Sequence, residues 1–356
     1  MRVALIGPPQ SGKSSLFTAV AAAGGSQVDM SRPDQPHLAV VKVPDSRLEW
    51  LKDHYKPKKT TPAELEFIDL PGMDLTDEAG RTRARNLWPE IRKADMLVFV
   101  VRSFQDGSVA PYRDRIDPGA DVEEFLSEML FADLEQVSNR VEKLEASVKK
   151  PTPRRDEQLK ELELFTRLRE ALESEQRLAE LATNEAQQKI LRSFAFFSQK
   201  PAIAVLNCGE DQLAGPHPEQ LHGLPVLPLS AQIEEEIAQL DPEERQEFLA
   251  DLGIEVSARD RLIQACYARM DLISFLTSGE DECRAWTIQS GTEAVEAAGE
   301  IHSDIARGFI RAETVAFEDL REAGEMKLAK AAGKVRLEGK NYVVQDGDII
   351  NFRFNV

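Results

Sequence analysis

Eight consecutive residues near the start of the chain carry the clearest chemistry. Gly7-Pro8-Pro9-Gln10-Ser11-Gly12-Lys13-Ser14 matches the pattern GxxxxGK[ST], directly after the apolar run Val3–Ile6 and before a helical stretch, Ser14–Ala23. This context predicts phosphate binding, because glycine lets backbone N–H groups approach a phosphate closely and a helix N-terminus favours negative charge. A glycine turn with a chance lysine is the alternative, and the matched context disfavours it. We expect Lys13 to reach the β- and γ-phosphates as the catalytic residue and Ser14 to bind Mg²⁺.

A second chemical element ends a later strand. Phe67-Ile68-Asp69-Leu70-Pro71-Gly72 places an aspartate at the strand end, followed by glycine in a DxxG pattern. Alone this pattern is weak, because aspartate before a Pro-Gly turn is common. Downstream of a phosphate-binding loop, it predicts that Asp69 holds Mg²⁺ through water and that the Gly72 N–H senses the γ-phosphate. The predicted metal ligands are Ser14 and Asp69, and the predicted phosphate-binding residues are Gly7, Gln10, Ser11, Gly12, Lys13, Ser14, Ser15 and Gly72.

A third element concerns the nucleotide base. After the apolar run Ala202–Leu206 comes Asn207-Cys208-Gly209-Glu210, an NxxE pattern. GTP-specific switch proteins have NKxD at this place, where the aspartate binds the guanine amino and imino groups. Cys208 replaces that lysine, and Glu210 replaces the aspartate with a side chain longer by one methylene, so we expect poor guanine selectivity. The predicted base-binding residues are Asn207, Cys208, Glu210, Ser230 and Ala231, the last two in the loop after Val226–Leu229.

The elements that must position these residues are short buried strands alternating with helices. Continuous apolar runs bounded by glycine, proline or polar residues are typical of a parallel sheet that is covered on both faces. With helical segments between most of them, they predict a doubly wound α/β fold, here a P-loop NTPase sheet. The predicted strands are Arg2–Ile6, Leu38–Val43, Leu65–Leu70, Met96–Val101, Ala202–Leu206 and Val226–Leu229.

The region 121–199 interrupts this alternation. Apolar residues from Leu130 to Val148 recur at spacings of four and three, which is typical of a coiled-coil seam. Lys149–Pro153 ends this pattern, and a second helix with similar spacing runs from Leu159 to Leu172. We therefore predict an antiparallel helical hairpin inserted into the α/β domain. Two roles stay open for it: stiffening the fold, or forming a protruding arm for a partner.

The last part of the chain reads as a separate small α+β domain. Short strand candidates alternate there with glycines and one helix, Ala294–Ala298. The predicted strands are Arg284–Ile288, Val335–Leu337, Tyr342–Val344 and Ile349–Phe354. The predicted domains are thus 1–120 with 200–276 for nucleotide binding, 121–199 for the hairpin, and 277–356 for the C-terminal domain.

Composition narrows the class of protein. The chain has 356 residues and a formal net charge of -18, which disfavours nucleic-acid binding through overall charge but leaves a local basic patch open. Three widely spaced cysteines predict neither a disulfide framework nor a zinc site, as expected in a reducing cytosol. Because the sequence contains no apolar stretch of about 20 residues, we expect no membrane span and a cytoplasmic location. The oligomeric state is left open.

With these residues in place, the chain resembles the YchF/Obg-like ATPase family over nearly its whole length. The resemblance implies a ubiquitin-like β-grasp (TGS) fold for the C-terminal domain. It also implies ATP as ligand with GTP less favoured, and association with ribosomes or ribosome-associated RNA or protein. Besides the phosphate-binding loop, the NxxE pattern and the helical insertion, the matching stretches are Val43–Leu48, Leu240–Arg245, Arg284–Thr287, Ala297–Gly299, Ile301–Asp304, Arg307–Glu313 and Gln345–Asp348.

Departures from the family pattern mark the chain as a divergent paralogue and bear on catalysis. Gln10 stands where the family usually has asparagine, so potassium dependence stays open, and Ser31–His37 contains no threonine for Mg²⁺. Met73–Glu78 replaces a glycine-rich segment of the family. In the loop after the Arg-x-Phe match, Arg102-Ser103-Phe104, the residues Val109–Tyr112 stand where the family typically has a histidine. Met73 cannot hydrogen-bond a water molecule, so we expect slow hydrolysis by a nucleotide-dependent switch. The alternative is an adaptor with little hydrolysis that binds partners through the hairpin and C-terminal domain.

Overall fold

The computed structural model describes residues 1–23, 30–32, 34–150, 153–181, 183–241, 244 and 256–355. Its contacts divide the chain into two compact units. The first comprises Met1–Ala22, Gln27–Ala39 and Phe67–Arg245, and the second comprises Ala23–Ser26, Val40–Glu66 and Gln246–Val356. The domain boundaries given above stay a prediction. Parts of Leu240–Arg245 and of the proline turn Lys149–Pro153 lie outside the described residues.

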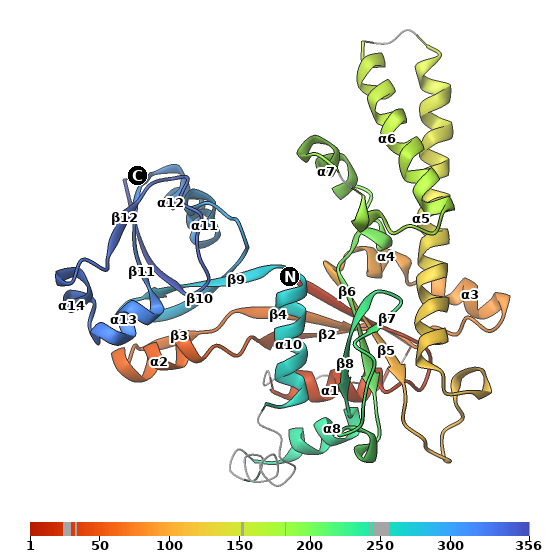
Figure 1. Ribbon diagram of the computed structural model, residues 1–356, viewed down its shortest axis with the longest axis horizontal. Coiled ribbons are helices and arrows are strands. Elements are labelled where there is room, and N and C mark those ends of the chain that lie inside the picture. The colour runs from red at the N-terminus through yellow and green to blue at the C-terminus, as the bar shows by residue number, and fades with distance from the viewer. Residues whose placement is uncertain are drawn as a thin grey trace. The chain divides into compact units, whose positions relative to one another are not determined.

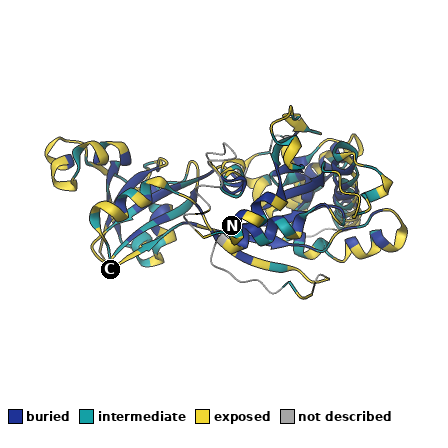
Figure 2. Ribbon diagram, turned by 90° about the horizontal axis from the view of Figure 1, so that it is seen from below, coloured by how far each residue is buried: buried dark blue, intermediate teal, exposed yellow. Residues whose placement is uncertain are grey.

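The first unit contains most of a seven-stranded sheet, and the predicted α/β fold is confirmed. Parallel pairing joins β1 to β5, β5 to β6 and β6 to β8, with Ile6 opposite Phe99 and Ala204 opposite Val226. All residues of β5 and β6 are buried, which explains why their sequences are apolar up to the last residue of each strand. Figure 2 shows buried residues in dark blue. The strands, in sheet order, are β2 (His37–Lys42), β4 (Glu64–Asp69), β1 (Arg2–Ile6), β5 (Met96–Arg102), β6 (Ala202–Asn207), β8 (Leu224–Leu229) and β7 (Gln220–Leu221).

Helices connect these strands and carry the loops of interest (Figure 1). Helix α1 begins at Lys13, directly in the phosphate-binding pattern, and α8 begins after Ser230, whose hydroxyl caps it by accepting from the Ile233 N–H. The helices of the first unit are α1 (Lys13–Ala23), α3 (Glu78–Arg85), α4 (Trp88–Arg92), α5 (Pro118–Val148), α6 (Arg155–Glu173), α7 (Glu185–Arg192) and α8 (Ala231–Gln239).

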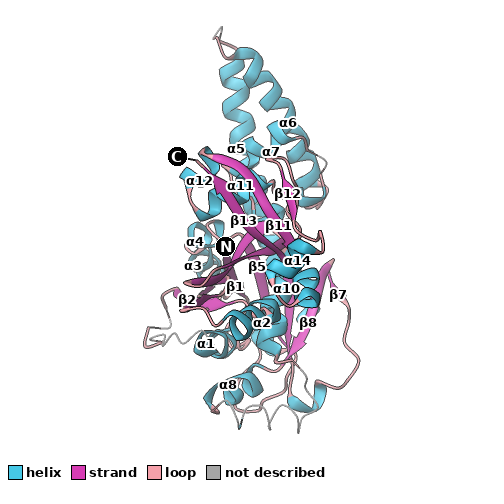
Figure 3. Cartoon of the chain, turned by 90° about the vertical axis from the view of Figure 1, so that its left-hand side faces the viewer, coloured by secondary structure: helices cyan, strands magenta, loops and turns pink. Residues whose placement is uncertain are grey.

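The predicted helical hairpin is present, and α5 and α6 lie side by side in Figures 1 and 3. Asp117 caps α5 and Pro118 occupies its first turn, where a missing N–H costs nothing. The far half of α5 packs Val137, Val141 and Leu144 against α6 in a hydrophobic cluster of its own. The near half packs Val122, Phe125 and Met129 into the core over the sheet. One helix is therefore shared by two cores. On α6, Leu159 of the predicted seam is 43% exposed.

The second unit contains a six-stranded sheet in the order β12-β11-β13-β9-β10-β3. Its edge strand β3 (Lys59–Thr61) comes from the N-terminal part of the chain and pairs in parallel with β10. The remaining strands are β9 (Leu272–Ser278), β10 (Glu282–Gln289), β11 (Phe309–Ala316), β12 (Arg336–Glu338) and β13 (Asp348–Phe354), and the helices are α2 (Ser46–Tyr55), α10 (Ala258–Arg269), α11 (Ala294–Ile301), α12 (Ser303–Arg307), α13 (Phe317–Ala323) and α14 (Met326–Ala331).

Two features of this unit differ from the sequence prediction. Tyr342–Val344 is not a strand and forms only an isolated bridge between Val343 and Glu293. The neighbouring backbone groups instead bond to the start of α11: the Tyr342 carbonyl accepts from the Ala294 N–H, and the Val344 N–H donates to the Thr292 carbonyl. The strands β9 and β11 were not predicted. No described helix has both the length and the apolar character to traverse a membrane.

Candidate nucleotide site

The backbone of the phosphate-binding loop is fixed by close packing at its two glycines. Gly7 has φ of +152°, and a Cβ there would lie 2.2 Å from the Val100 carbonyl oxygen. Gly12 has φ of +89°, and a Cβ there would lie 2.1 Å from Asn207 Nδ2. Side chains are excluded at both positions, which leaves the backbone N–H groups accessible for an anion. Gln10, also at positive φ, lies exposed at the tip of the loop.

Lys13 is buried within this loop, with 5% of its surface exposed. Its Nζ donates to the Pro8 carbonyl at 2.8 Å. Burial lowers the pKa of Lys13 to about 8, and the negative charge of Asp69 opposes that shift. The lysine is therefore held where the phosphates are expected, with one backbone carbonyl as partner. A bound phosphate would provide a further negatively charged partner, besides Asp69, for the buried ammonium group.

Ser14 and Asp69 lie together at the end of β4. The Ser14 hydroxyl donates to Asp69 Oδ2 at 2.8 Å. The other carboxylate oxygen, Oδ1, is buried and has no hydrogen-bond partner among the described residues. Burial raises the pKa of Asp69, while Ser14, Lys13 and His37 act in the opposite direction. His37, at the start of β2, was not predicted as a site residue. It is the last residue of Ser31–His37, the segment in which the sequence contains no threonine that could bind Mg²⁺.

This pair of oxygen ligands fits Mg²⁺. The ion prefers oxygen and is commonly bound by one or two protein groups together with substrate phosphates. Asp69 Oδ1, which accepts no hydrogen bond from the residues that the structure describes, lies buried on the carboxylate that the Ser14 hydroxyl contacts. Across the described ranges no three histidine, cysteine, aspartate or glutamate side chains gather to form a protein-only metal site. A Mg²⁺ ion at Ser14 and Asp69 would supply charge neutralisation for the phosphates.

The segment after Asp69 is connected to the phosphate-binding loop. The Met73 N–H donates to the Gly7 carbonyl at 3.1 Å. At the exposed Gly72, a Cβ would lie 2.7 Å from the Pro9 Cα, so the two segments meet there without room for a side chain. The Met73 side chain is 1% exposed and belongs to the core over the sheet. It therefore points away from any position where it could orient a water molecule.

Asn207 links the loop to α8, although the sequence predicted it only as a base-binding residue. Its Nδ2 donates to the Ser11 carbonyl at 2.9 Å, and its Oδ1 accepts from the Ala231 N–H at 2.9 Å. Both polar ends of the side chain are thus bonded to backbone, and the residue is 3% exposed. Ser11 Oγ is buried beside it, with no hydrogen-bond partner in the part of the chain that the structure describes.

The other predicted base residues lie around this amide. Cys208 is buried, its thiol donates to the Leu206 carbonyl at 3.3 Å, and burial raises its pKa. Glu210 is exposed at the start of a 3₁₀ turn, Glu210–Gln212. Ser230 is buried as the cap of α8, and Ala231 is the first residue of that helix. Their contact with a base stays a prediction.

Arg102, at the end of β5, fixes the loop that follows it. Its guanidinium donates to the carbonyls of Phe104, Asp106 and Val109 at 3.1, 3.2 and 3.1 Å. The arginine is 5% exposed, and its charge lies 4.3 Å from the centre of the Phe104 ring. The sequence showed the Arg-x-Phe motif but gave no role for it. The structure shows that this arginine shapes the loop leading to Tyr112.

Comparisons with known proteins identify the family of the chain. A family model described as a 50S ribosome-binding GTPase matches residues 2–136. The YchF-GTPase C-terminal family, described as a protein of unknown function (DUF933), matches residues 272–355. The ribosome-binding ATPase YchF of Bacillus subtilis (strain 168) is 40% identical over 363 residues, which cover 99% of this chain and 98% of that protein. The chain belongs to the YchF/Obg-like ATPase family.

Further members of the YchF/Obg-like family extend the match. Obg-like ATPase 1 of Oryza sativa subsp. japonica is 35% identical over 375 residues, covering 100% of this chain and 92% of that protein. The structure of the Schizosaccharomyces pombe YchF GTPase superimposes with a TM-score of 0.84 at 26% identity, covering 99% of this chain and 97% of that one. The family resemblance stated from the sequence is confirmed.

Proposed function

We propose that this chain is a Mg²⁺-dependent nucleotide switch that binds ATP and hydrolyses it slowly. The observation that carries the proposal is the group formed by Lys13, Ser14 and Asp69. In it a buried lysine and a carboxylate oxygen with no hydrogen-bond partner among the described residues meet at a glycine-lined loop. Lys13 and the loop N–H groups would stabilise negative charge on the phosphates. Phosphoryl transfer depends chiefly on such positioning and charge stabilisation.

ATP is the nucleotide we expect to be preferred. Guanine selectivity in NKxD proteins depends on an aspartate at a fixed distance from the base. Glu210 is exposed and one methylene longer, and the Cys208 thiol donates to the Leu206 carbonyl in the preceding strand, β6. Neither side chain supports a guanine-specific contact. GTP is therefore proposed as the weaker ligand.

Slow turnover follows from what surrounds the γ-phosphate position. Met73 is packed in the core, so it cannot take the place of a water-orienting side chain. We assign no general base, and hydrolysis would rely on Lys13, the loop N–H groups and Mg²⁺. Association with a partner would then raise the rate or use the nucleotide state to change affinity.

A ribosomal partner and a cytoplasmic location are proposed from the relatives. Proteins at 34–40% identity over at least 98% of their length carry the name ribosome-binding ATPase YchF. The surfaces available for such a partner are the coiled-coil-like hairpin of α5 and α6 and the C-terminal unit, for which we propose the TGS type of β-grasp domain. A basic patch rather than the overall charge would have to contact RNA, because the net charge is -18.

Steady-state phosphate release with Mg²⁺-ATP tests the enzyme proposal. In Lys13→Ala the charged group at the phosphates is lost, so turnover falls to the level of buffer alone. Undiminished turnover in that variant would place hydrolysis elsewhere and reject the proposal.

The burial of Met73 also favours a second candidate, an adaptor that binds nucleotide and scarcely hydrolyses it. The same assay separates the two. Phosphate release by the parent protein that exceeds the Lys13→Ala blank over many hours rejects the adaptor. Release equal to that blank, with ATP still bound, supports it.

A further inference from the structure

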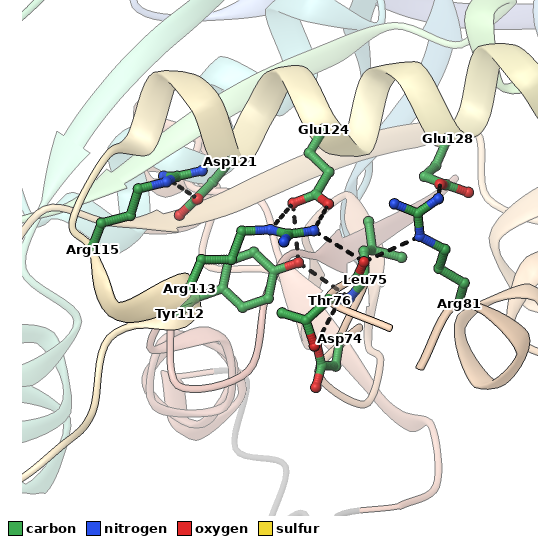
Figure 4. Close-up of polar contacts among 10 residues, drawn as sticks. All are labelled: Asp74, Leu75, Thr76, Arg81, Tyr112, Arg113, Arg115, Asp121, Glu124 and Glu128. Carbon is green, nitrogen blue, oxygen red and sulfur yellow. Dashed lines mark hydrogen bonds and ion pairs between the residues drawn. The ribbon is translucent and has the colours of Figure 1, made fainter. Parts of the chain in front are cut away.

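The backbone N–H and the backbone carbonyl of Leu75, shortly after Gly72, both form hydrogen bonds with side chains (Figure 4). The Leu75 N–H donates to the Tyr112 hydroxyl at 3.1 Å. The Leu75 carbonyl accepts from Arg113 Nη2 at 3.1 Å and from Arg81 Nε at 3.2 Å. Since the Leu75 side chain is itself fully buried, this residue has little freedom to move by itself.

The side chains that hold Leu75 are in turn bound to α5 (Figure 4). The Tyr112 hydroxyl donates to Glu124 Oε2 at 3.1 Å. Arg113 donates from Nε to the same oxygen at 2.9 Å and from Nη2 to Oε1, which makes a bidentate ion pair. One turn further along α5, Glu128 forms an ion pair with Arg81 at 3.2 Å. Residues four apart on a helix share a face, so both carboxylates lie toward the Leu75 segment.

Backbone strain is concentrated where these contacts are made. Arg113 and Asp114 both have φ of +52°, a left-handed conformation that residues with a Cβ rarely adopt. Such a conformation persists only where surrounding contacts compensate for its strain. The bidentate bond to Glu124 and the bond to Leu75 are the contacts that Arg113 gains in this conformation.

The pKa values of Tyr112 and Arg113 keep both side chains protonated, as their hydrogen bonds to Glu124 require. Burial raises the pKa of Tyr112 to about 12, so its hydroxyl stays neutral and can accept from Leu75 while donating to Glu124. Hydrogen bonds to Glu124 raise the pKa of Arg113, which stays charged. Tyr112 and Arg113 therefore both keep the protons that they donate across the physiological pH range.

The two ends of the network reach the phosphate-binding loop and the hairpin. At one end, Met73 donates to the Gly7 carbonyl only two residues before Leu75. At the other, α5 packs first into the core over the sheet and then into the hairpin core. Any displacement of the Gly72–Leu75 segment must therefore break these bonds or move α5 with it.

We propose that Tyr112, Arg113 and Glu124 are positioning residues, which set the Gly72–Leu75 segment against the phosphate-binding loop and couple its position to α5. This inference rests on the proposed nucleotide binding. When a nucleotide binds, the Gly72 N–H moves toward the γ-phosphate, and the bonds at Leu75 carry the change to Glu124. The hairpin then differs between the triphosphate and diphosphate states.

The test uses the full chain in three forms: the parent, Arg113→Ala and Tyr112→Phe. For both variants kcat for ATP falls about tenfold, as expected for the loss of about 1.4 kcal/mol of positioning, while KM stays within about twofold. In Arg113→Lys, which keeps the charge but not the bidentate fork, kcat recovers only in part. A KM increase with unchanged kcat would contradict a positioning role.

Hydrogen exchange gives a second readout that needs no turnover. In the parent, protection of the α5 amides around Val122–Met129 differs between ADP and a non-hydrolysable ATP analogue, and in Arg113→Ala this difference disappears. The matched control is Arg115→Ala, because Arg115 bonds to the Asp117 carbonyl and the Asp121 carboxylate and so anchors only the start of α5 (Figure 4). That variant keeps the difference.

Failure of this inference is distinguishable from failure of the proposed function. If nucleotides bind the parent but α5 shows no ADP–ATP difference, or if Arg113→Ala keeps the difference, the coupling is wrong. If calorimetry finds no nucleotide binding to the parent, the proposed function itself is wrong.

Discussion

Lys13 is the residue whose chemistry is most constrained by its surroundings. It is buried, it donates to a carbonyl of its own loop, and its pKa is lowered from 10.5 to about 8. Between these two pH values the unfolded chain binds the proton more strongly than the folded protein. Stability of the nucleotide-free protein therefore rises with pH over this window, and the cost of the buried charge is fully present below pH 8.

Nucleotide binding should have the opposite pH dependence. Phosphates favour the charged lysine, so binding above about pH 8 takes up a proton, and affinity falls by up to about tenfold per pH unit. Calorimetry at about pH 7 and about pH 9, in buffers that differ in ionisation enthalpy, measures this uptake directly. Lys13→Arg is the control, since arginine stays charged throughout and removes the uptake. Equal affinity and no proton uptake at the higher pH would show that Lys13 does not contact the phosphates.

Single residues also show what a sequence pattern can and cannot predict. The glycines of the loop were predictable, because a left-handed φ and the close approach of Val100 and Asn207 are conditions that only glycine meets. The bonds of Asn207 were not, because they join residues 196 positions apart and depend on how β6 is placed beside the loop. Tyr112 and Arg113 gave no signal either, since their role follows from a strained turn rather than from a motif.

At the scale of elements, the site consists of loops that are joined by hydrogen bonds from side chains. Asn207 joins the phosphate-binding loop to the first turn of α8, through one carbonyl and one N–H. Removing its amide leaves both groups buried without a partner, which costs about 1–3 kcal/mol for each.

Asn207→Ala should therefore lose about 3 kcal/mol of unfolding free energy and much of its nucleotide affinity. Urea unfolding and titration with ATP measure the two effects. Gln212→Ala is a suitable comparison, because Gln212 also bridges two backbone groups, Gly209 N–H and the Ser103 carbonyl, but does so away from the loop. If both variants lose affinity equally, Asn207 has no special role in holding the loop.

The elements themselves were predictable to different degrees. Fully buried strands such as β5 and β6, and helix α6, have strong apolar patterns, and each was predicted within a few residues. The seam of α5 was predicted only from Leu130, whereas the helix begins at Pro118, because its first turns pack against the sheet and not against α6. Strand β9 was missed because it follows α10 directly, through a turn at Asp271 with φ of +53° in place of glycine. Strand β11 was missed because its sequence mixes charged and apolar residues, with only part of it buried.

At the scale of the whole molecule, the second unit is drawn from distant parts of the chain. Arg47 at the start of α2 pairs with Asp45 and with Asp346, and Asp346 also accepts from the Ser274 N–H. These bonds place α2 beside the C-terminal strands of that unit. The predicted domain boundaries place this helix in the nucleotide-binding domain. A bond such as the one between Arg47 and Asp346 joins distant residues, so no local sequence pattern indicates it.

The negative net charge of the chain opposes the binding of an anionic nucleotide. With a net charge of -18, the molecule repels a nucleoside triphosphate at long range. The attraction that binds it must therefore come from local groups and from a cation. Lys13 supplies one positive charge, and Mg²⁺ at Ser14 and Asp69 would supply two more. Mg²⁺ should therefore strengthen binding markedly, and only when the Asp69 carboxylate is present.

A calorimetric titration of the parent and of Asp69→Asn with ATP and GTP, each with and without Mg²⁺, tests the central claim most directly. We predict that ATP binds more tightly than GTP, that Mg²⁺ strengthens binding to the parent, and that this strengthening is lost in Asp69→Asn. A preference for GTP of tenfold or more, equal to about 1.4 kcal/mol, would contradict the assignment of Glu210. Binding that is the same with and without Mg²⁺ would contradict the metal site at Ser14 and Asp69.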